Sequence, residues 1–400
     1  MASNFSEALT NIKMSPIVSI SEEVRNIAPD FQKKSGKNFL MFQRGEIDFP
    51  TPKYIVEAAK HALDSGFTKY PKSGGEKKLK EVIIEKLASY NNAKNLMPQN
   101  VVATYGGQEA LELSFKLFKG KKGAGFAPTW SCVLENFIPY SEVVFTQVPL
   151  NEDFSIDFAG LEDVLKESAF FYLNTPQNPT GKLFSEEEVR KIVDLCEKYD
   201  TYLISDEAYE MIVYENHKHF SPLSIESDRI LSAFTFSKTF SMTGWRLGYL
   251  VTRNKEINEI MKLGNYTQTA GVTTFVQHAG IEALRNKEEY KKALSEIITE
   301  FSKRREAMFN GFNSIDGIEV EKPFGGFYFF PNFKNFIPDN VSGAERESYI
   351  YNKLLDSGIA AVYGSCFGKY FTDNVRFSFS TTPVEVIEEG IERMNILFNK

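Results

Sequence analysis

Short apolar runs alternate with amphipathic stretches through the middle of the chain. Runs with the length of buried strands lie at residues 101–104, 123–127, 169–173, 202–205 and 230–236. Residues 107–118 predict a helix between two of these runs, and a second helix is predicted after the capping box of Ser185 and Glu188. Strands without strict alternation, separated by helices, predict an α/β fold: a mainly parallel sheet sandwiched by helices.

The last third of the chain has a different pattern. The predicted elements are a long charged helix at 287–309, a helix at 346–356, strands at 359–363 and 375–380, and a helix at 383–398. In NVRFSFS, Phe377 and Phe379 alternate with polar residues, which is typical of a strand with one apolar face. We therefore predict a large α/β domain at 50–285, a smaller α+β domain at 286–400, and an N-terminal segment at 1–49 that packs with the smaller domain.

Composition narrows the class of protein. A length of 400 residues suits one large and one smaller domain, because single cores stop growing near about 250–300 residues. A net charge of -7 argues against nucleic acid as a partner, and no apolar run approaches the roughly 20 residues of a membrane span. The three cysteines are far apart and the first residues lack a secretory pattern, so we expect a cytoplasmic protein.

Polar and aromatic residues follow the ends of five predicted strands. Ligands of open α/β sheets bind beyond the carboxyl ends of the strands. The residues at those ends are Gly106, Gly107 and Gln108, then Trp130, then Asn178 in NTPQNPTG, then Asp206 and Tyr209, and finally Ser237 and Lys238. Singly, most have structural explanations: GGQEAL suits a tight turn, Trp130 a core position, Asp206 a helix cap, and NPTG a turn.

Lys238 is harder to explain by structure alone. Burying an ammonium group directly after a core strand is costly, and lysines placed in this way often form Schiff bases. A lysine, a carboxylate at Asp206 and an aromatic face at Trp130 together suit pyridoxal phosphate, with Asp206 at the ring nitrogen. The predicted phosphate ligands are Thr235, Ser237, Arg246 and the turn at 106–108.

Seven motifs occur in order along the chain: GEIDFPTP (45–52), YPKSGGEKKLKE (70–81), TYGGQEAL (104–111), NTPQNPTG (174–181), SDEAYE (205–210), SKTFSMTGWRLGY (237–249) and VRFSFS (375–380). From about residue 40 to the C-terminus, the chain resembles the class I/II pyridoxal-phosphate-dependent aminotransferases, the aspartate aminotransferase-like group of fold type I. The resemblance implies transfer of an amino group from an L-amino acid to a 2-oxo acid with ping-pong kinetics.

The resemblance also implies roles for residues around the cofactor. Lys238 would form the Schiff base and move the substrate's α-proton, and Asp206 would pair with the pyridine nitrogen. Tyr209 and Asn178 would contact the 3′-oxygen. Trp130 would stack on the ring.

Further implied roles concern the substrate and a second subunit. Arg376 would bind the substrate's α-carboxylate near Gly45, beside Asn178 and Trp130. Tyr70 would reach the partner subunit's phosphate, which implies a homodimer. The sequence offers no clear second arginine for a dicarboxylate side chain, so the amino donor stays open.

Two positions depart from the family pattern, and several alternatives remain. Thr235 replaces the usual serine, and Tyr363 stands where proline is common, close to the predicted place of Arg376. Lyases, synthases and oxidases use the same residue set, and some transcription regulators carry this domain with an added DNA-binding module. His217 and His219 lie in a polar loop, where we expect two exposed histidines and no metal. Ile17 and Ile47 are candidates for lining the pocket.

Overall fold

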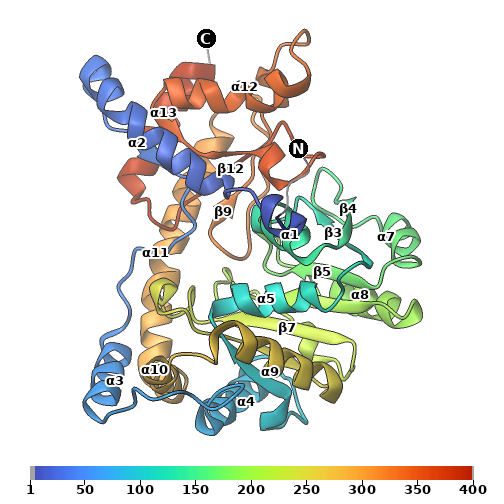
Figure 1. Ribbon diagram of the computed structural model, residues 1–400. Coiled ribbons are helices and arrows are strands. Elements are labelled where there is room, and N and C mark those ends of the chain that lie inside the picture. The colour runs from blue at the N-terminus through green and yellow to red at the C-terminus, as the bar shows by residue number, and fades with distance from the viewer. Residues whose placement is uncertain (1–4, 399–400) are drawn as a thin grey trace.

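The computed structural model describes residues 5–398, and a seven-stranded sheet runs through the larger part of this chain (Figure 1). The strand order is β2-β8-β7-β6-β5-β3-β4. The strands are β2 Val101–Thr104, β3 Lys122–Ala127, β4 Val144–Pro149, β5 Phe170–Asn174, β6 Tyr202–Asp206, β7 Ile230–Thr235 and β8 Gly248–Thr252. Within this sheet β8 runs against its neighbours β2 and β7, while the other neighbouring pairs are parallel.

Helices cover both faces of the sheet, because side chains that alternate along each strand are apolar on both faces. Phe171 and Leu203 join one buried cluster with α8 (Glu186–Lys198), whereas their neighbours Tyr172 and Ile204 join another with α5 (Gly106–Lys116). The helices of this part are α3 Lys53–Asp64, α4 Lys77–Tyr90, α5 Gly106–Lys116, α6 Ile138–Ser141, α7 Phe158–Leu165, α8 Glu186–Lys198, α9 Lys255–Thr269 and α10 Thr274–Arg285. The predicted α/β class, with a mainly parallel sheet between helices, is confirmed.

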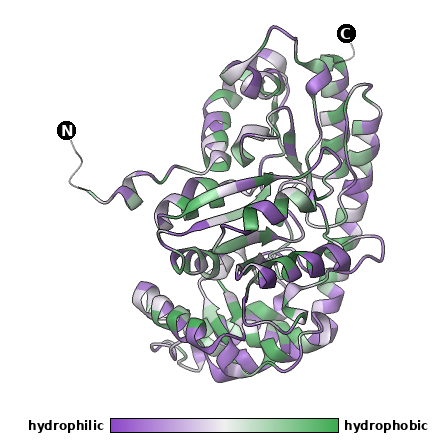
Figure 2. Ribbon diagram, turned by 90° about the vertical axis from the view of Figure 1, so that its right-hand side faces the viewer, coloured by the Kyte–Doolittle hydropathy of each residue, from purple (hydrophilic) through white to green (hydrophobic). Residues whose placement is uncertain are grey.

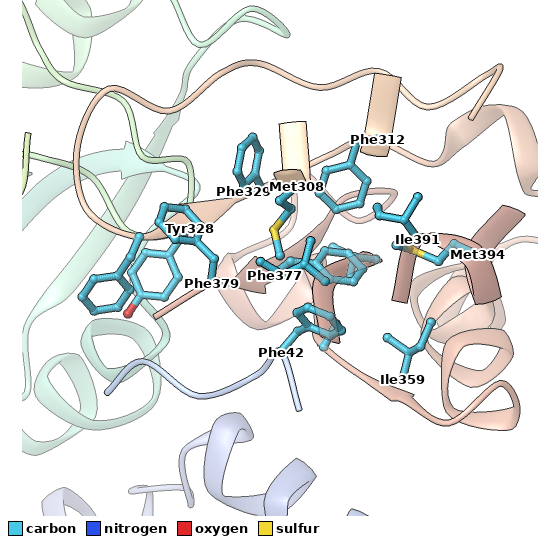
Figure 3. Close-up of a cluster of buried hydrophobic side chains, with 14 of the residues drawn as sticks. Phe42, Met308, Phe312, Tyr328, Phe329, Ile359, Phe377, Phe379, Ile391 and Met394 are labelled. Carbon is cyan, nitrogen blue, oxygen red and sulfur yellow. The ribbon is translucent and has the colours of Figure 1, made fainter. Parts of the chain in front are cut away.

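The C-terminal part packs a small sheet against long helices. Its elements are α11 Lys287–Asn313, β9 Tyr328–Phe329, α12 Gly343–Asp356, β10 Ile359–Ala360, β11 Val362–Tyr363, β12 Val375–Ser378 and α13 Val384–Phe398. Figure 3 shows its aromatic core, in which Phe329 and Phe377 meet Met308 and Phe312. The predicted strand at 359–363 is divided in two, because β10 pairs with β1 (Leu40–Met41) while β11 pairs with β12.

The N-terminal segment contacts both parts of the molecule. β1 (Leu40–Met41) pairs with β10, and α2 (Pro16–Ser35) contacts β11. The short helix α1 (Glu7–Thr10) instead contacts α6 beside the main sheet, and Figure 2 shows this end of the described chain reaching out from the body of the molecule. Among residues 5–398, no helix is long and apolar enough to cross a membrane.

Candidate active site

A cavity of about 1110 Å³ opens at the carboxyl edge of the main sheet. The strands β5, β6 and β7 end there, and the antiparallel strand β8 begins there. Residues that follow the first three strands and residues that precede β8 therefore lie at the same edge of the sheet. The cavity is lined by most of the residues that the sequence pointed to: Gly45, Gly107, Gln108, Trp130, Asn178, Asp206, Tyr209, Thr235, Ser237, Lys238, Arg246 and Arg376.

Lys238 follows β7 and its ammonium points at backbone. Its Nζ donates to the carbonyl oxygen of Gly45 at 2.6 Å. Burial lowers the pKa of Lys238 to about 8, and the positive guanidinium groups of Arg376 and Arg246 add to this shift. A substantial fraction of this amine is therefore neutral near pH 8, as a nucleophile or a base requires.

Asp206 ends β6 and is buried. Its Oδ2 accepts from the Tyr172 hydroxyl at 2.9 Å, and its Oδ1 accepts from the Ala208 N–H at 3.2 Å. Burial raises the pKa of Asp206 to about 6, although these hydrogen bonds favour the charged form. Above that pH, Asp206 presents a fixed negative charge to the cavity.

Tyr209 and Tyr328 form a buried pair beside Lys238. Their hydroxyl oxygens are 3.1 Å apart, and burial raises the pKa of Tyr209 well above its usual value. The Tyr328 hydroxyl also packs so closely on Gly45 that any Cβ there would collide with it. Only glycine at position 45 lets the backbone carbonyl reach Lys238 beside this tyrosine.

Arg376 lies on β12 and is fully buried in the cavity wall. Its Nη1 donates to Asn178 Oδ1 at 3.0 Å, and its Nη2 donates to the Gln43 carbonyl at 2.8 Å. Its guanidinium carbon lies 4.5 Å from the centroid of the Tyr328 ring, and its Nε has no hydrogen-bond partner in the described chain. This is a preorganised guanidinium with a free N–H in a site that suits a carboxylate.

The turn before α5 faces Arg246 and the end of β7. Gly106 has φ +70°, and a Cβ there would lie 2.8 Å from Arg246 Nη2. Arg246 itself has φ 57°, a left-handed conformation that is uncommon for a residue with a side chain. Thr235 Oγ1 donates to Ser237 Oγ at 2.9 Å and accepts from the Ser237 N–H. Hydroxyl groups, a guanidinium and a helix N-terminus thus converge, as an anion site requires.

Trp130 and Gln108 complete the cavity lining near this site. Trp130 follows β3 and packs edge-on against Phe137, with 5.8 Å between ring centroids. Gln108 lies in the first turn of α5 and is exposed. Both side chains are open to a ligand in the cavity.

Tyr70 lies outside this cavity. It is 91% exposed, so within one chain it has no place in the site. Tyr363 also lies outside the cavity and packs against Tyr351, with 5.0 Å between ring centroids. Ile17 lines the cavity, whereas Ile47 belongs to the buried core of the C-terminal part.

The expectation of two exposed histidines was wrong for His219. His217 is exposed, but the His219 ring is buried and its Nε2 lies 2.9 Å from Glu207 Oε2. The polar sequence of the loop gives no sign of this contact, because the partner, Glu207, lies twelve positions earlier in the chain, next to Asp206. Among residues 5–398, no group of three or more acidic, histidine or cysteine side chains could hold a metal ion.

A second buried pair lies behind the site. Lys86 of α4 donates to Glu210, which also accepts from Asn91 Nδ2 at 2.7 Å, while the Tyr90 hydroxyl donates to the Glu210 carbonyl at 2.9 Å. These bonds hold the turn after β6 that carries Tyr209.

Sequence reasoning missed several residues of the site. Tyr172 and Tyr328 were not singled out, because a tyrosine inside an apolar run is usually a core residue. N-terminal residues also line the cavity. Besides the predicted Ile17, they are Leu9, Ile12, Lys13, Met14, Ser15 and Val18. Their short helix and loop carry no periodic signal.

The amine of Lys238, the buried carboxylate of Asp206 and the anion site at Arg246 meet at one edge of a sheet of this topology. Together they define a pyridoxal-phosphate-dependent transferase of fold type I. More narrowly, the chain belongs to the class I and II aminotransferases: the family model "Aminotransferase class I and II" matches residues 37–394.

Similar proteins carry related names. A probable aspartate aminotransferase of Methanocaldococcus jannaschii is 34% identical over 95% of this chain and 100% of its own length. An aromatic-amino-acid aminotransferase of Thermococcus litoralis is 30% identical over 88% of this chain and 89% of its own. The solved structure of aspartate aminotransferase from Thermus thermophilus with maleate superposes with a TM-score of 0.89 at 28% identity, covering 99% of this chain and 100% of that one.

The protein is therefore a pyridoxal-phosphate-dependent aminotransferase, and the competing lyase, synthase or oxidase is not favoured. The residues present fit the cofactor on their own evidence. Gly107 at the start of α5, Thr235, Ser237 and Arg246 all line the cavity, so hydroxyl groups and a guanidinium face it beside a helix N-terminus, as a phosphate requires. Besides Arg246, the residues that would hold the phosphate are Gly107, Thr235 and Ser237.

Proposed function

We propose that this enzyme moves the amino group of an L-amino acid to a 2-oxo acid in two half-reactions, with Lys238 as the Schiff-base and proton-transfer residue. The observation that carries the proposal is the position of Lys238. Its Nζ has a pKa lowered to about 8 and lies in one cavity with Asp206 and Arg376. Pyridoxal phosphate, when bound, supplies an aldehyde for the amine and a ring that withdraws electrons from the substrate's Cα.

The chain's own residues divide the work between binding and proton transfer. Arg376 would bind the substrate's α-carboxylate with charge-assisted hydrogen bonds and fix its orientation. Asp206 would hold a proton on the ring nitrogen, and Tyr209 with Asn178 would bind the 3′-oxygen. Lys238 Nζ would take the proton from the substrate's Cα and release it to the carbon on the far side of the amino nitrogen, because a neutral amine at that place is both a base and a proton carrier.

We further propose a homodimer in the cytoplasm. Tyr70 is exposed on this chain and is available to the site of a partner subunit, close to its phosphate. The three cysteines are unpaired, as expected in a reducing compartment.

The test is a single half-reaction. An L-amino acid without an acceptor should bleach the visible band of the cofactor-loaded enzyme and release one equivalent of 2-oxo acid per chain. Adding a different 2-oxo acid should restore the band. Continued product release without an acceptor would instead indicate a lyase or an oxidase and refute the proposal.

A further inference from the structure

One wall of the cavity is apolar and comes from a single segment of the chain. We name as the apolar wall the five residues Leu9, Ile12, Met14, Ile17 and Val18, all of which line the cavity. Leu111 of α5, Phe137 and Tyr140 line the same cavity. The contact between α1 and α6 brings the two groups of residues together.

The apolar wall is only partly covered by protein. Leu9 is 60% exposed, Ile12 37% and Val18 41%. Removing apolar surface of this kind from water is favourable in proportion to the area buried. A ligand side chain that enters the cavity would bury this apolar surface, and so bind more tightly, if it were apolar and large enough to touch the wall.

Most polar groups near the wall already have partners. Lys13 pairs with Glu135 at 3.5 Å, and the Lys13 carbonyl accepts from Asn136 Nδ2 at 2.8 Å. Glu112 accepts from Lys116 at 2.7 Å. Apart from the groups assigned to the cofactor and the α-carboxylate, two cations line the cavity, Lys13 and Arg44. Both are exposed, and Arg44 has no ion pair within residues 5–398.

From these contacts we infer that the apolar wall binds the side chain of the substrate and selects 2-amino acids with bulky apolar side chains, aliphatic or aromatic. The inference rests on the proposed function and adds the substrate class. It differs from the aspartate named for several similar proteins, because a carboxylate side chain needs a well-placed cation. Outside the groups assigned above, the cations that line this cavity are Lys13 and Arg44, and both are solvent-exposed.

The experiment compares donors in wild-type, Ile12→Asn and Val18→Asn enzymes. The control is Ile27→Asn, since Ile27 is 36% exposed on the same helix as Val18 and does not line the cavity. We expect Ile12→Asn and Val18→Asn to lower kcat/KM for leucine and phenylalanine by about tenfold or more, in line with the value of a methylene in an apolar pocket. Aspartate should change by less than about threefold, and the control should leave all three donors at wild-type rates.

Binding of unreactive analogues supplies a second measurement that needs no turnover. Calorimetric titration of the holoenzyme should show that 3-phenylpropionate binds more tightly than succinate, and that Ile12→Asn removes this preference. Tighter binding of succinate, together with loss of aspartate activity in Lys13→Ala or Arg44→Ala, would overturn the inference in favour of an acidic substrate.

The outcomes separate the two proposals. If no donor bleaches the cofactor band, the proposed function fails. If donors bleach it but both asparagine variants lose activity equally for leucine, phenylalanine and aspartate, with a changed sedimentation coefficient, the wall is a contact between copies of the chain and the inference alone fails.

Discussion

The cavity has two halves that are built in different ways. Around Lys238, side chains come from several strand ends and are held by buried hydrogen bonds, such as those from Arg376 to Asn178 and from Tyr172 to Asp206. The apolar wall comes from one segment: its loop residue Lys13 bonds to Glu135 and Asn136, and its Ile17 packs against a buried cluster of the body. The difference follows from the tasks: proton transfer needs fixed geometry, whereas apolar selection needs only shape and area.

The largest expected effect is at the centre of the first half. Lys238→Ala should lower kcat by about 10⁴-fold or more, because it removes both the attachment point and the proton carrier. Lys80→Ala is a suitable control, since burial also lowers the pKa of Lys80 but its side chain lies outside the cavity. Steady-state turnover at near the wild-type rate in Lys238→Ala would refute the role of Lys238.

Arg376→Ala should lower kcat/KM by about 100-fold or more for every donor, because it removes a buried, fully oriented cation. Arg376→Lys keeps the charge but loses the forked geometry, so it should recover only part of the loss. Equal losses for leucine and aspartate would separate this residue from the apolar wall, whose variants should discriminate. A loss confined to one donor would show that Arg376, like the apolar wall, acts on the substrate's side chain and would contradict its assignment to the α-carboxylate.

The buried pair Lys86–Glu210 supports the turn that carries Tyr209. Lys86→Met should lower the free energy of unfolding by about 3–5 kcal/mol, because it leaves the Glu210 carboxylate buried without its counter-charge. Urea unfolding followed by fluorescence measures this change. The double variant Lys86→Met with Glu210→Gln should be less destabilised than the single variant. Equal stability of wild type and Lys86→Met would show that this pair does not support the site.

The pH dependence tests the environment of Lys238. Burial lowers the pKa of Lys238 to about 8, so its reactive neutral form is lost as pH falls below that value. The rate at which apoenzyme captures pyridoxal phosphate should therefore fall by about tenfold per pH unit below pH 8 and level off above it. Stopped-flow absorbance gives the profile. A rate that still rises steeply at pH 10 would indicate an ordinary, solvated lysine.

The smallest effect is expected at the ion pair that joins the segment of the apolar wall to Glu135. Glu135→Gln removes the ion pair with Lys13, whose side chain is 75% exposed. Exposed pairs contribute about 0–1 kcal/mol, so kcat/KM for leucine should change by less than about threefold. Steady-state assays at low and high salt check this. A tenfold loss would show that the apolar wall depends on fixed geometry as strictly as the first half does.

The same contrast explains what the sequence predicts. Lys238 and Asp206 follow buried strands directly, so topology alone brings them to one edge of the sheet. Tyr328 could not be found in this way, because its contacts with Tyr209 and Gly45 join residues far apart in the chain. The apolar wall was missed except for Ile17, since a loop without a period carries no signal that it lines a cavity.

The reversed strand β8 has a consequence for folding. Because β7 and β8 are antiparallel neighbours, the segment from Lys238 to Arg246 is a local loop between paired strands. The pairing of β8 with β2 instead joins residues about 150 positions apart. Closing the short loop costs less chain entropy than closing the long one, so the lysine and the arginine reach the same edge of the sheet through the less costly of these two pairings.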